Sequence, residues 1–479
     1  MDEALSQVRA SAAWADGFEF RLDLIDGADL HRLFRATRKP RIATLRPDWE
    51  GGRFHGAEKE RLDVLLEAGA RGAEYIDVEL AAGKEATGIL RRHLPRTRLI
   101  VSQHAETTPT SSEEAYQRLK GARGDIVKWA FPADDSPDLR FVIDFLQRAN
   151  RDRLKAVSIA TGERGEASRI LYRRFGAWAT YAAPETGPHA GDGQIPASML
   201  KRVYRSHKLT RRTKVFGVLG NPVRQSKGIY VHNALFSRQH SNAVYARFPT
   251  TDLDRFARDL LPYLHGCSVT IPFKEQVQRY CSRLEPRAVA IGATNTLFRH
   301  RSQLTGANTD ASAALDAIER VIRVRGKTLL VVGAGGAARA LVFEATRRGA
   351  EVVVTNRTFD RAAMLAREFG ASAVPLDEVL NVRYAILANA TPVGMYPGVD
   401  QMPVPRELLQ PGRVVFDVVY APRVTLLLRM AKEAGARTVE GMEMYILQAA
   451  KQSELFLGKR ADIRSIRRTI SSLVNGEGR

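Results

Sequence analysis

The sequence predicts an α/β protein built mainly from parallel strands with helices between them. Three observations lead to this prediction. Short apolar runs alternate with amphipathic stretches over the first two hundred residues, the alternation restarts after a basic stretch near residue 205, and a glycine-rich turn joins a strand to a helix in the last third. A chain of 479 residues is long enough for about three domains of roughly 150 residues each.

The first part of the chain has the alternation that is typical of a barrel. We expect seven strands there, namely Glu19–Leu24, Ile42–Arg46, Tyr75–Leu80, Leu99–His104, Ile126–Phe131, Ala156–Ala160 and Ala179–Ala183. Amphipathic segments such as Glu58–Ala68 and Leu139–Asn150 separate most of them. Polar residues end these strands, where a (β/α)8 barrel keeps its chemistry: Arg21, Arg46, Glu79, His104 and Thr161.

A closed barrel of that kind needs eight strands, and Glu19–Leu24 has the position of the second. We therefore expect a (β/α)8-type barrel without its first strand, so that either translation begins upstream or a substitute closes the barrel. A missing strand would expose the edges of its two neighbours.

After the basic stretch Lys201–Lys214, in which seven of fourteen residues are Lys or Arg, a second α/β pattern begins. We read this stretch as a last helix running into a linker. The strands expected beyond it are Lys214–Leu219, Ala243–Phe248, Gly266–Ile271, Thr294–Phe298, Leu329–Val332, Val352–Thr355, Tyr384–Ala388 and Val414–Val418.

Composition limits the classes of protein that fit. The chain offers no run of ~18 apolar residues, so we expect no transmembrane helix, and its first residues lack the apolar core of a signal peptide. Two cysteines, Cys267 and Cys281, fit a reducing compartment and have no metal-site spacing. These features predict a cytoplasmic protein without a metal.

The net charge is +20, which could indicate nucleic-acid binding. The basic residues are scattered, however, and no patch with interleaved aromatic residues stands out. We therefore favour a preference for anionic small molecules over a nucleic-acid partner.

The glycine-rich turn has the G-x-G-x-x-A pattern of a dinucleotide-binding βαβ unit. Gly333 permits the tight turn, and Gly335 lets the backbone approach a pyrophosphate. Gly336 and Ala337 open the helix, whose N-terminus supplies free N–H groups and a positive dipole end. The alternative is a glycine turn that binds nothing.

The residues after the second strand of this unit select the cofactor. An NAD enzyme usually has Asp or Glu there for the ribose 2′-hydroxyl, whereas this chain has Asn356, Arg357 and Thr358, with Arg361 one turn further. Because a cation suits a 2′-phosphate, we predict NADP(H).

Hydroxyls, amides and one Lys/Asp pair gather in the strands before that unit. Ser226 follows the strand at Lys214–Leu219, Thr270 and Lys274 follow the next apolar strand, and Asn295 and Asp310 come later. Such a set suits a polyhydroxylated acid and a proton donor for a carbinol oxygen. Each motif taken singly also fits an ordinary turn or a solvated surface lysine.

This part of the chain resembles shikimate dehydrogenase, over roughly Lys214–Gly458. The matching motifs are Ser268–Lys274, Gly292–Thr296, Gly306–Asp310, Gly333–Arg339, Asn356–Thr358, Asn389–Met395, Asp417–Tyr420 and Gly441–Gln448. The resemblance implies that Lys274 and Asp310 form the catalytic pair. It also implies that Gly441 belongs to the cofactor site and that five residues bind substrate: Ser226, Thr270, Asn295, Tyr420 and Gln448.

The family's first loop carries Ser-x-Ser, and here it reads Ser226-Lys-Gly228. Losing a donor to a charged group could cost about 1.5–3 kcal/mol of shikimate binding. Alternatively, Gly228 makes room for the additional hydroxyl of quinate. We therefore expect weakened shikimate binding or some quinate activity.

A candidate Schiff-base site lies in the first part of the chain. Lys128 stands in an apolar strand, and a desolvated lysine is a ready nucleophile toward a ketone. His104 could move the proton and Glu50 could orient its imidazole. Arginines supply cations for a carboxylate, namely Arg21, Arg46 and Arg169. The alternative is a lysine that points outward beside a histidine satisfied in a loop.

This part resembles type I 3-dehydroquinate dehydratase over nearly all of residues 1–205. The matching runs are Glu19–Arg21, Arg46–Gly52, Tyr75–Leu80, Ser102–His104, Lys128, Ser168-Arg169 and Gly193-Gln194. The resemblance implies that Lys128 forms the imine, His104 removes the proton, Glu50 holds His104, and Arg169 with Gln194 binds the carboxylate. The family's Ser-Ala-Pro-Gly-Gln loop reads Ala190-Gly-Asp192-Gly-Gln194, so that a serine hydroxyl is lost and a carboxylate, Asp192, stands near the expected anion site.

The two resemblances imply consecutive reactions, from 3-dehydroquinate through 3-dehydroshikimate to shikimate. They divide the chain into a barrel at 1–205, a linker at 206–213, a substrate domain at 214–324, an NADP-binding Rossmann domain at 325–440 and C-terminal helices at 441–479 that return to the substrate domain. Two alternatives stay open, a metabolite-sensing regulator and a quinate/shikimate dehydrogenase with an impaired dehydratase half. We expect no membrane partner, and a homodimer is kept as an option.

Overall fold

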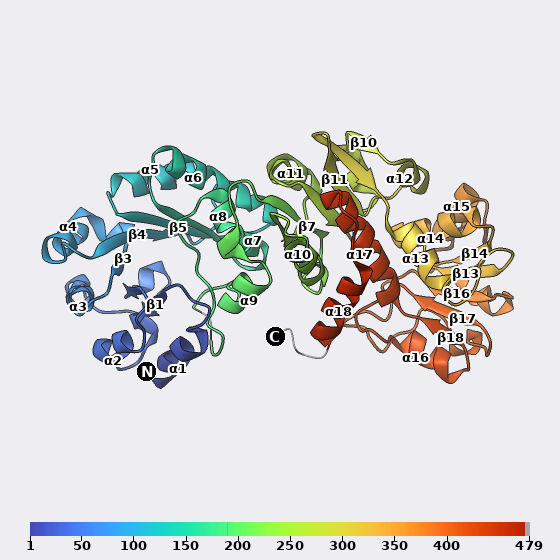
Figure 1. Ribbon diagram of the computed structural model, residues 1–479, viewed down its shortest axis with the longest axis horizontal. Helices are drawn as coiled ribbons and strands as arrows, with labels where there is room; N and C mark the ends of the chain where they lie inside the picture. The colour runs from blue at the N-terminus through green and yellow to red at the C-terminus, as the bar shows by residue number, and fades with distance from the viewer. Residues whose placement is uncertain (189, 475–479) are drawn as a thin grey trace. The chain divides into compact units, whose positions relative to one another are not determined.

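The computed structural model describes residues 1–188 and 190–474 (Figure 1). The chain divides into two compact units. Unit 1 comprises Met1–Val215 and Asn242–Tyr263, and unit 2 comprises Phe216–Ser241 and the residues from Leu264 onward. The domain boundaries expected from the sequence stay predictions.

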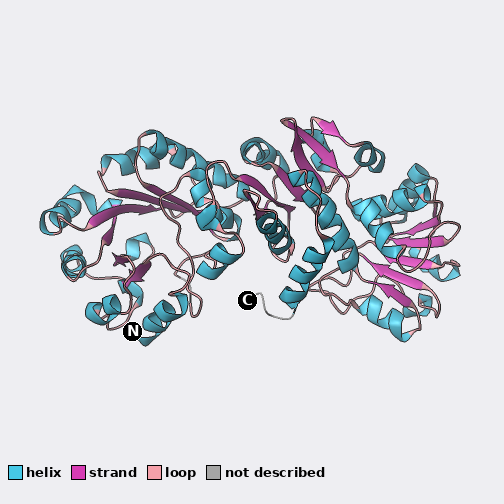
Figure 2. Cartoon of the chain, in the orientation of Figure 1, coloured by secondary structure: helices cyan, strands magenta, loops and turns pink. Residues whose placement is uncertain are grey.

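Unit 1 contains a six-stranded parallel sheet in which the strands follow one another in chain order. Its strands are β1 Phe18–Arg21, β2 Arg41–Thr44, β3 Tyr75–Glu79, β4 Arg98–His104, β5 Ile126–Pro132 and β6 Ala156–Thr161. Helices occupy the connections between these strands, as Figure 2 shows: α2 Leu30–Arg35, α3 Glu58–Ala70, α4 Gly83–His93, α5 Glu113–Gly121 and α6 Leu139–Arg151. Helix α1 Asp2–Ser11 precedes β1, and three helices follow β6: α7 Glu166–Ile170, α8 Tyr172–Phe175 and α9 Ala197–Arg202.

The alternation of side chains along these strands divides one face of the sheet into layers. Ile100, Ile126, Val157 and Ile159 form an apolar cluster on this face. Ile42 and Tyr75 pack against this cluster. Because side chains on a strand alternate between the two faces, the residues two positions beyond Ile42, Tyr75, Ile100 and Ile126 share the face: Thr44, Asp77, Ser102 and Lys128. The next layer holds Arg46, Glu79 and His104. Apolar packing therefore supports a polar layer at the carboxyl ends of the strands.

The α/β fold with a parallel, barrel-type sheet is confirmed, and six of the seven expected strands form within a few residues of their expected ends. The seventh, Ala179–Ala183, was predicted wrongly. Trp178 donates to Ala156 O at 2.8 Å, but Ala183 turns to an isolated bridge with Pro196 instead of continuing along β6. Within the described residues the sheet is thus an open half-barrel that ends at β1 and β6.

The second sheet has the strand order β10-β12-β11-β9-β7-β8, in which β11 runs antiparallel to both of its neighbours. The third is entirely parallel, in the order β15-β14-β13-β16-β17-β18. Their strands are β7 Lys214–Gly220, β8 Ala243–Pro249, β9 Gly266–Val269, β10 Arg283–Leu284, β11 Thr296–His300, β12 Gln303–Ala307, β13 Thr328–Val332, β14 Glu351–Thr355, β15 Ser372–Ala373, β16 Ile386–Asn389, β17 Val414–Asp417 and β18 Arg437–Val439.

The remaining helices are α10 Gly228–Arg238, α11 Leu253–Asp259, α12 Pro286–Ile291, α13 Asp310–Ile318, α14 Gly336–Arg347, α15 Phe359–Phe369, α16 Leu426–Glu433, α17 Gly441–Leu457 and α18 Ile463–Val474. After β18, α17 and α18 pack against α10 through Met442, Ile446 and Ile466. Among the described residues, no helix is both long and apolar enough to cross a membrane.

Candidate active sites

Lys128 projects from the middle of β5 onto the polar layer of unit 1. Its side chain is buried, its Nζ lies 2.8 Å from Asp77 Oδ2 and 3.4 Å from Glu19 Oε1, and the ring of Tyr181 lies 4.3 Å from Nζ. The cost of burying an ammonium is offset by two carboxylates and an aromatic face. The alternative of an outward-pointing, solvated lysine is therefore wrong.

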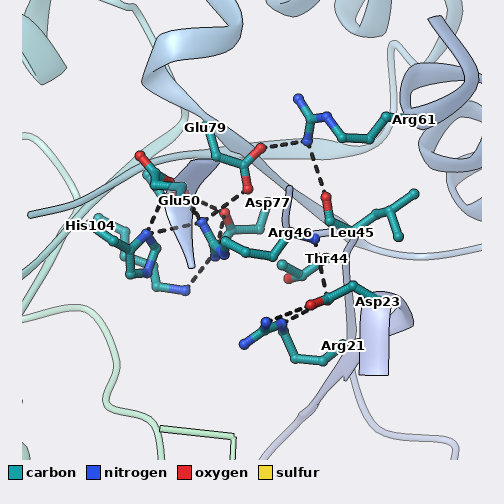
Figure 3. A network of polar contacts seen from close by, with 12 residues as sticks. Arg21, Asp23, Thr44, Leu45, Arg46, Glu50, Arg61, Asp77, Glu79 and His104 are labelled. Carbon is teal, nitrogen blue, oxygen red and sulfur yellow. Dashed lines mark hydrogen bonds and ion pairs between the residues drawn. The ribbon is translucent and has the colours of Figure 1, made fainter. Parts of the chain in front are cut away.

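His104, Glu50 and Arg46 meet at the carboxyl end of the same sheet (Figure 3). His104 Nδ1 lies 3.1 Å from Glu50 Oε2 and 3.0 Å from Arg46 Nη1, while Arg46 Nη1 lies 3.0 Å from Glu50 Oε2. Glu50 stands in the short helical turn Asp48–Glu50 after β2, and Gly51 ends that turn with φ +76°. The loop therefore aims a carboxylate at the imidazole that ends β4.

Burial and neighbouring charge set the protonation of this pair. Burial raises the pKa of Glu50 to about 7, although Arg46 opposes the rise. Burial also lowers the pKa of His104 well below its usual value, and the positive charges of Arg46 and Lys128 add to this. The imidazole is therefore neutral near pH 7, as a general base must be.

The predicted carboxylate-binding residues lie on α7 and on the loop before α9. Arg169 donates to Tyr181 O and to Asp192 O, both at 3.1 Å, whereas its Nε is buried without a partner among the described residues. Burial lowers the pKa of Arg169 to about 10. Gln194 Oε1 is likewise buried and unpaired in the described chain. Arg21, in contrast, pairs with Asp23 at 2.7 Å.

Sequence reasoning missed Asp77 as a member of this site. It is fully buried, accepts a hydrogen bond from Ser102 Oγ at 2.6 Å and forms the shorter of the two ion pairs of Lys128. Burial alone would raise the pKa of Asp77, but Lys128 and Arg46 outweigh it and hold that pKa well below its usual range. The available signal was the pair of carboxylates, Asp77 and Glu79, at alternate positions of one buried strand.

In unit 2, Lys274 follows β9 and Asp310 begins α13. Lys274 Nζ lies 2.6 Å from Asp310 Oδ2. The two side chains are 19% and 7% exposed, so the pair can be reached by a ligand. The structure thus brings together the two groups that the sequence singled out for proton transfer.

The predicted substrate-binding residues have different surroundings. Asn295 Nδ2 donates to Thr309 Oγ1 at 2.9 Å, and Thr309 N donates to Asn295 Oδ1 at 2.8 Å, so this amide also holds the turn before Asp310. Ser226 Oγ accepts from Gly228 N at 3.2 Å. Thr270 follows β9 directly, with its N–H donating to Leu219 O.

The other two members come from the third sheet and from α17. Burial raises the pKa of Tyr420 to about 12, and its ring packs on Tyr445 at 4.8 Å. Gln448 lies on α17, one turn before the buried Gln452. Sequence reasoning missed Gln452, which donates to Asn295 O and Thr296 Oγ1, both at 3.1 Å, and so supports the amide-bearing turn.

The glycine-rich turn between β13 and α14 fits a dinucleotide. Gly333 has φ +118°, which favours glycine, and its N–H donates to Thr355 O. A Cβ on Gly335 would meet nothing within 4 Å, so this backbone borders open space. Arg357 and Arg361 are exposed beyond the end of β14, and Asn356 Nδ2 donates to Thr358 O at 3.0 Å.

Two close approaches of a helix N-terminus occur in unit 2, one of them at this turn. A Cβ on Gly336 would lie 3.2 Å from Lys274 Cβ, so the N-terminus of α14 abuts the predicted proton donor. A Cβ on Gly441 would lie 2.5–2.7 Å from the carbonyl oxygens of residues 417–419, so the start of α17 needs glycine for a close backbone approach. No group of three or more His, Cys, Asp or Glu in the described chain could hold a metal.

Two chemically different sites, one with a buried lysine among acids and bases and one beside a nucleotide-binding turn, define a two-site metabolic enzyme of the α/β class. Family models identify both halves: type I 3-dehydroquinase matches residues 1–211, the shikimate dehydrogenase substrate binding domain matches 218–297, and shikimate / quinate 5-dehydrogenase matches 316–390. The chloroplastic bifunctional 3-dehydroquinate dehydratase/shikimate dehydrogenase of Arabidopsis thaliana is 36% identical over 94% of this chain and 79% of its own length. The chain belongs to this bifunctional family.

Single-function relatives match the second half. The NADP(+) shikimate dehydrogenase of Pyrococcus furiosus is 38% identical over 53% of this chain and 94% of its own length. The crystal structure of a shikimate dehydrogenase in complex with NADP+ covers 55% of this chain and 96% of its own, with a TM-score of 0.52 and 34% identity. Quinate dehydrogenase from Corynebacterium glutamicum in complex with NAD covers 54% and 99%, with a TM-score of 0.51 and 27% identity.

Because the pKa of Glu50 is raised to about 7, we expect elimination at the unit 1 site to lose rate on the acid side of that pH. Below it the carboxyl binds a proton and no longer supports a cationic His104. Steady-state kcat/KM against pH checks this. Glu50→Gln should remove that acid limb and lower kcat by roughly 100-fold, whereas Asp48→Asn, in the same loop, should leave both unchanged. An identical limb in the glutamine variant would contradict the assignment.

Proposed function

We propose that the chain dehydrates 3-dehydroquinate to 3-dehydroshikimate in unit 1 and reduces 3-dehydroshikimate to shikimate with NADPH in unit 2. The observation that carries the proposal is that each unit pairs a reactive lysine with an acidic partner at the end of a sheet. Lys128 lies against Asp77, and Lys274 lies against Asp310 beside the nucleotide-binding turn.

In unit 1, the amine of Lys128 attacks the ring ketone, and loss of water from the adduct forms an iminium bond. The ammonium must lose a proton to become a nucleophile, and this proton leaves with the water that the adduct expels. Asp77 stays ionised and is the counter-ion first of the ammonium and then of the iminium. The positive nitrogen also lies over the ring of Tyr181, which favours the charged form.

The iminium acidifies the neighbouring carbon, and His104 removes its proton. With Glu50 ionised, the Nδ1–H of His104 can donate to the carboxylate, so that Nε2 is the base. The C–O bond then breaks and the hydroxyl leaves as water, with the proton supplied by the imidazolium. Addition of water to the iminium releases the product and restores Lys128.

In unit 1 the unpaired polar atoms of Arg169 and Gln194 orient the substrate. The free Nε of Arg169 donates to the substrate carboxylate, and the unpaired Oε1 of Gln194, on the loop before α9, accepts a hydrogen bond from a ring hydroxyl. Glu19 and Arg46 face ring hydroxyls, and Arg21 stays bound to Asp23. Asp192 contributes its backbone carbonyl to Arg169, so the exchange of the family's Ser-Ala-Pro for Ala190-Gly-Asp192 leaves the arginine clamp in place.

In unit 2, bound NADPH supplies the hydride. Lys274 protonates the oxygen of the ketone that becomes the alcohol, and Asp310 orients the ammonium and accepts a hydrogen bond from a neighbouring ring hydroxyl. Ser226, Thr270, Asn295, Tyr420 and Gln448 bind the remaining hydroxyls and the carboxylate. The N-terminus of α14 would hold the pyrophosphate of the cofactor, and Arg357 and Arg361 would hold its 2′-phosphate.

The two lysine–carboxylate pairs argue against a metabolite-sensing regulator, because binding alone requires no proton-transfer group at these positions. A cytoplasmic location and a homodimer stay predictions, and the Arabidopsis relative is chloroplastic by name.

The function is tested with the full chain. Borohydride added with 3-dehydroquinate should attach the ligand irreversibly to Lys128, as located by peptide mass, and NADPH should be consumed when 3-dehydroquinate alone is supplied. Lys128→Met should abolish trapping and dehydration but leave shikimate oxidation intact, and Lys120→Met, at a surface lysine, should change neither. Silence of the wild-type chain in both assays would refute the proposal.

The cofactor assignment predicts a loss of selectivity in an arginine variant. Arg357→Ala should raise the KM for NADPH by about 10- to 100-fold, the value of one or two lost hydrogen bonds to a charged phosphate, and should leave the KM for NADH unchanged. Arg367→Ala, on the next helix, is the matched control. Equal effects on the two cofactors would place the 2′-phosphate elsewhere.

We further propose that Gly228 enlarges the substrate pocket of unit 2 so that it accepts quinate beside shikimate. Gly228 is buried at the start of α10 and has no side chain of its own that would compete with an additional ring hydroxyl. Gly228→Ser should restore a donor, tighten shikimate binding by about 10- to 100-fold and abolish quinate oxidation. Steady-state kinetics with both acids decide, and tight shikimate binding without quinate turnover in the wild-type chain would contradict the idea.

A further inference from the structure

Arg61 is a fully buried charge on α3, outside the set of strands that carries the unit 1 site. Its Nη1 donates to Glu79 Oε2 and, at 3.2 Å, to Leu45 O (Figure 3). On its other side, Nε and Nη2 donate to the two carboxylate oxygens of Glu58 at 2.8 and 2.7 Å. Burying a guanidinium costs free energy, whereas an arginine at the surface could form the same ion pair with Glu58 without that cost. The burial of Arg61 therefore suggests a role beyond the stability of α3.

Glu79 joins Arg61 to the catalytic end of the sheet. Its second oxygen, Oε1, lies 2.9 Å from Arg46 Nη1, so the carboxylate bridges two guanidinium groups. Arg46 in turn contacts the remaining polar groups of the site, namely Glu50 at 3.0 Å, His104 Nδ1 at 3.0 Å, Ser102 Oγ at 3.1 Å and Asp77 at 3.4 Å. The orientation of Arg46 is therefore shared between the site and Glu79.

We propose that Arg61 is a positioning residue of the dehydratase site. It fixes Glu79, and through Glu79 it holds Arg46 in the orientation that keeps Glu50 aligned with His104. This inference rests on the proposed function of unit 1. Among the described residues, no contact joins Arg61 to His104 or Lys128. Its charge therefore acts on the site through Glu79, while its hydrogen bond to Leu45 O supports the backbone just before Arg46.

The charges around Glu50 and His104 give the proposal a distinctive signature. The groups that face the pair are Arg21 on β1, Arg46 at the end of β2, Asp77 and Glu79 on β3, and Lys128 on β5. Burial raises the pKa of Glu79 against the opposing charges of Arg46 and Arg61. Without Arg61, Glu79 therefore takes up a proton more readily, and a neutral Glu79 no longer opposes the ionisation of Glu50. The pKa of Glu50 then falls.

Arg61→Leu in the full chain tests this. We expect kcat for dehydration to fall by roughly 100-fold with a much smaller change in KM, because a misaligned base slows the chemistry more than binding. The acid limb of kcat/KM should also move to lower pH. Arg61→Lys keeps the charge, so it should restore the acid limb and recover part of kcat. Shikimate oxidation by unit 2 reports the amount of intact chain in each preparation.

Glu79→Gln tests the route of the effect without changing volume. It should shift the acid limb as Arg61→Leu does, and the double variant should show no further shift, because both changes remove the same negative charge. Arg71→Leu, at an exposed arginine that follows α3 and pairs with Glu67, is the control and should leave the pH profile unchanged.

The outcomes separate the two hypotheses. A wild-type chain without dehydratase activity would refute the function of unit 1, whereas an active wild type with unchanged kcat and pH profile in Arg61→Leu would refute the positioning role. Additive shifts in the double variant would also refute it. If Arg61→Leu fails to fold, a wild-type pH profile and an undiminished kcat in Glu79→Gln would refute the role equally.

Discussion

The half-barrel of unit 1 depends on the pairing of charges that the chain buries above its apolar layer. Four cations are buried there, Lys128, Arg46, Arg61 and Arg169. Three of them face the carboxylates of Asp77, Glu79, Glu50 and Glu19. The ion pairs of Lys128 and Arg46 with these carboxylates are 2.8–3.4 Å long, and Arg61 pairs with Glu79. Removing one member of such a set leaves its partner as an unpaired charge in the protein interior, which solvates it poorly. The arrangement is therefore fixed as a whole, and each pKa in it reflects the others.

This pairing explains why neighbouring carboxyl groups have different chemical roles. Asp77 lies against Lys128 and Arg46, and its pKa is held low, which keeps it an anion throughout the reaction. Glu50 is buried with fewer positive charges around it, and its pKa is raised to about 7. It can therefore exchange a proton near neutral pH as the charge of His104 changes. Environments that separate the pKa values of adjacent acids are characteristic of acid–base sites. The single exception among the cations, Arg169, keeps an unpaired Nε, which is the property expected of a group that waits for an anionic ligand.

The sequence predicts those parts of both sites that rest on local patterns. Apolar strands that end in polar residues revealed Lys128 and His104, and the glycine turn revealed the nucleotide-binding unit, because strand, turn and helix are encoded within about thirty residues. Strands β12 and β18 escaped prediction because Gln303–Ala307 and Arg437–Val439 have too little apolar alternation. Ala179–Ala183 has strand-like composition, yet a distant bridge to Pro196 redirects it. Arg61 and Gln452 look like ordinary polar positions of amphipathic helices, and only tertiary packing shows that they are buried.

In unit 2, the charge of the lysine at the site is balanced in a different way. Lys274 has one carboxylate partner and is partly exposed, so the pair needs no surrounding network to balance its charge. Its proposed reactivity instead depends on position, since the N-terminus of α14 lies directly against its side chain and places the proposed proton donor beside the glycine-rich turn. The residues of the unit 1 site all precede residue 200, and those of the unit 2 site all follow residue 220. Neither site borrows a group from the other, so a substitution that disturbs the buried charges of unit 1 should leave the lysine–aspartate pair of unit 2 chemically unaltered.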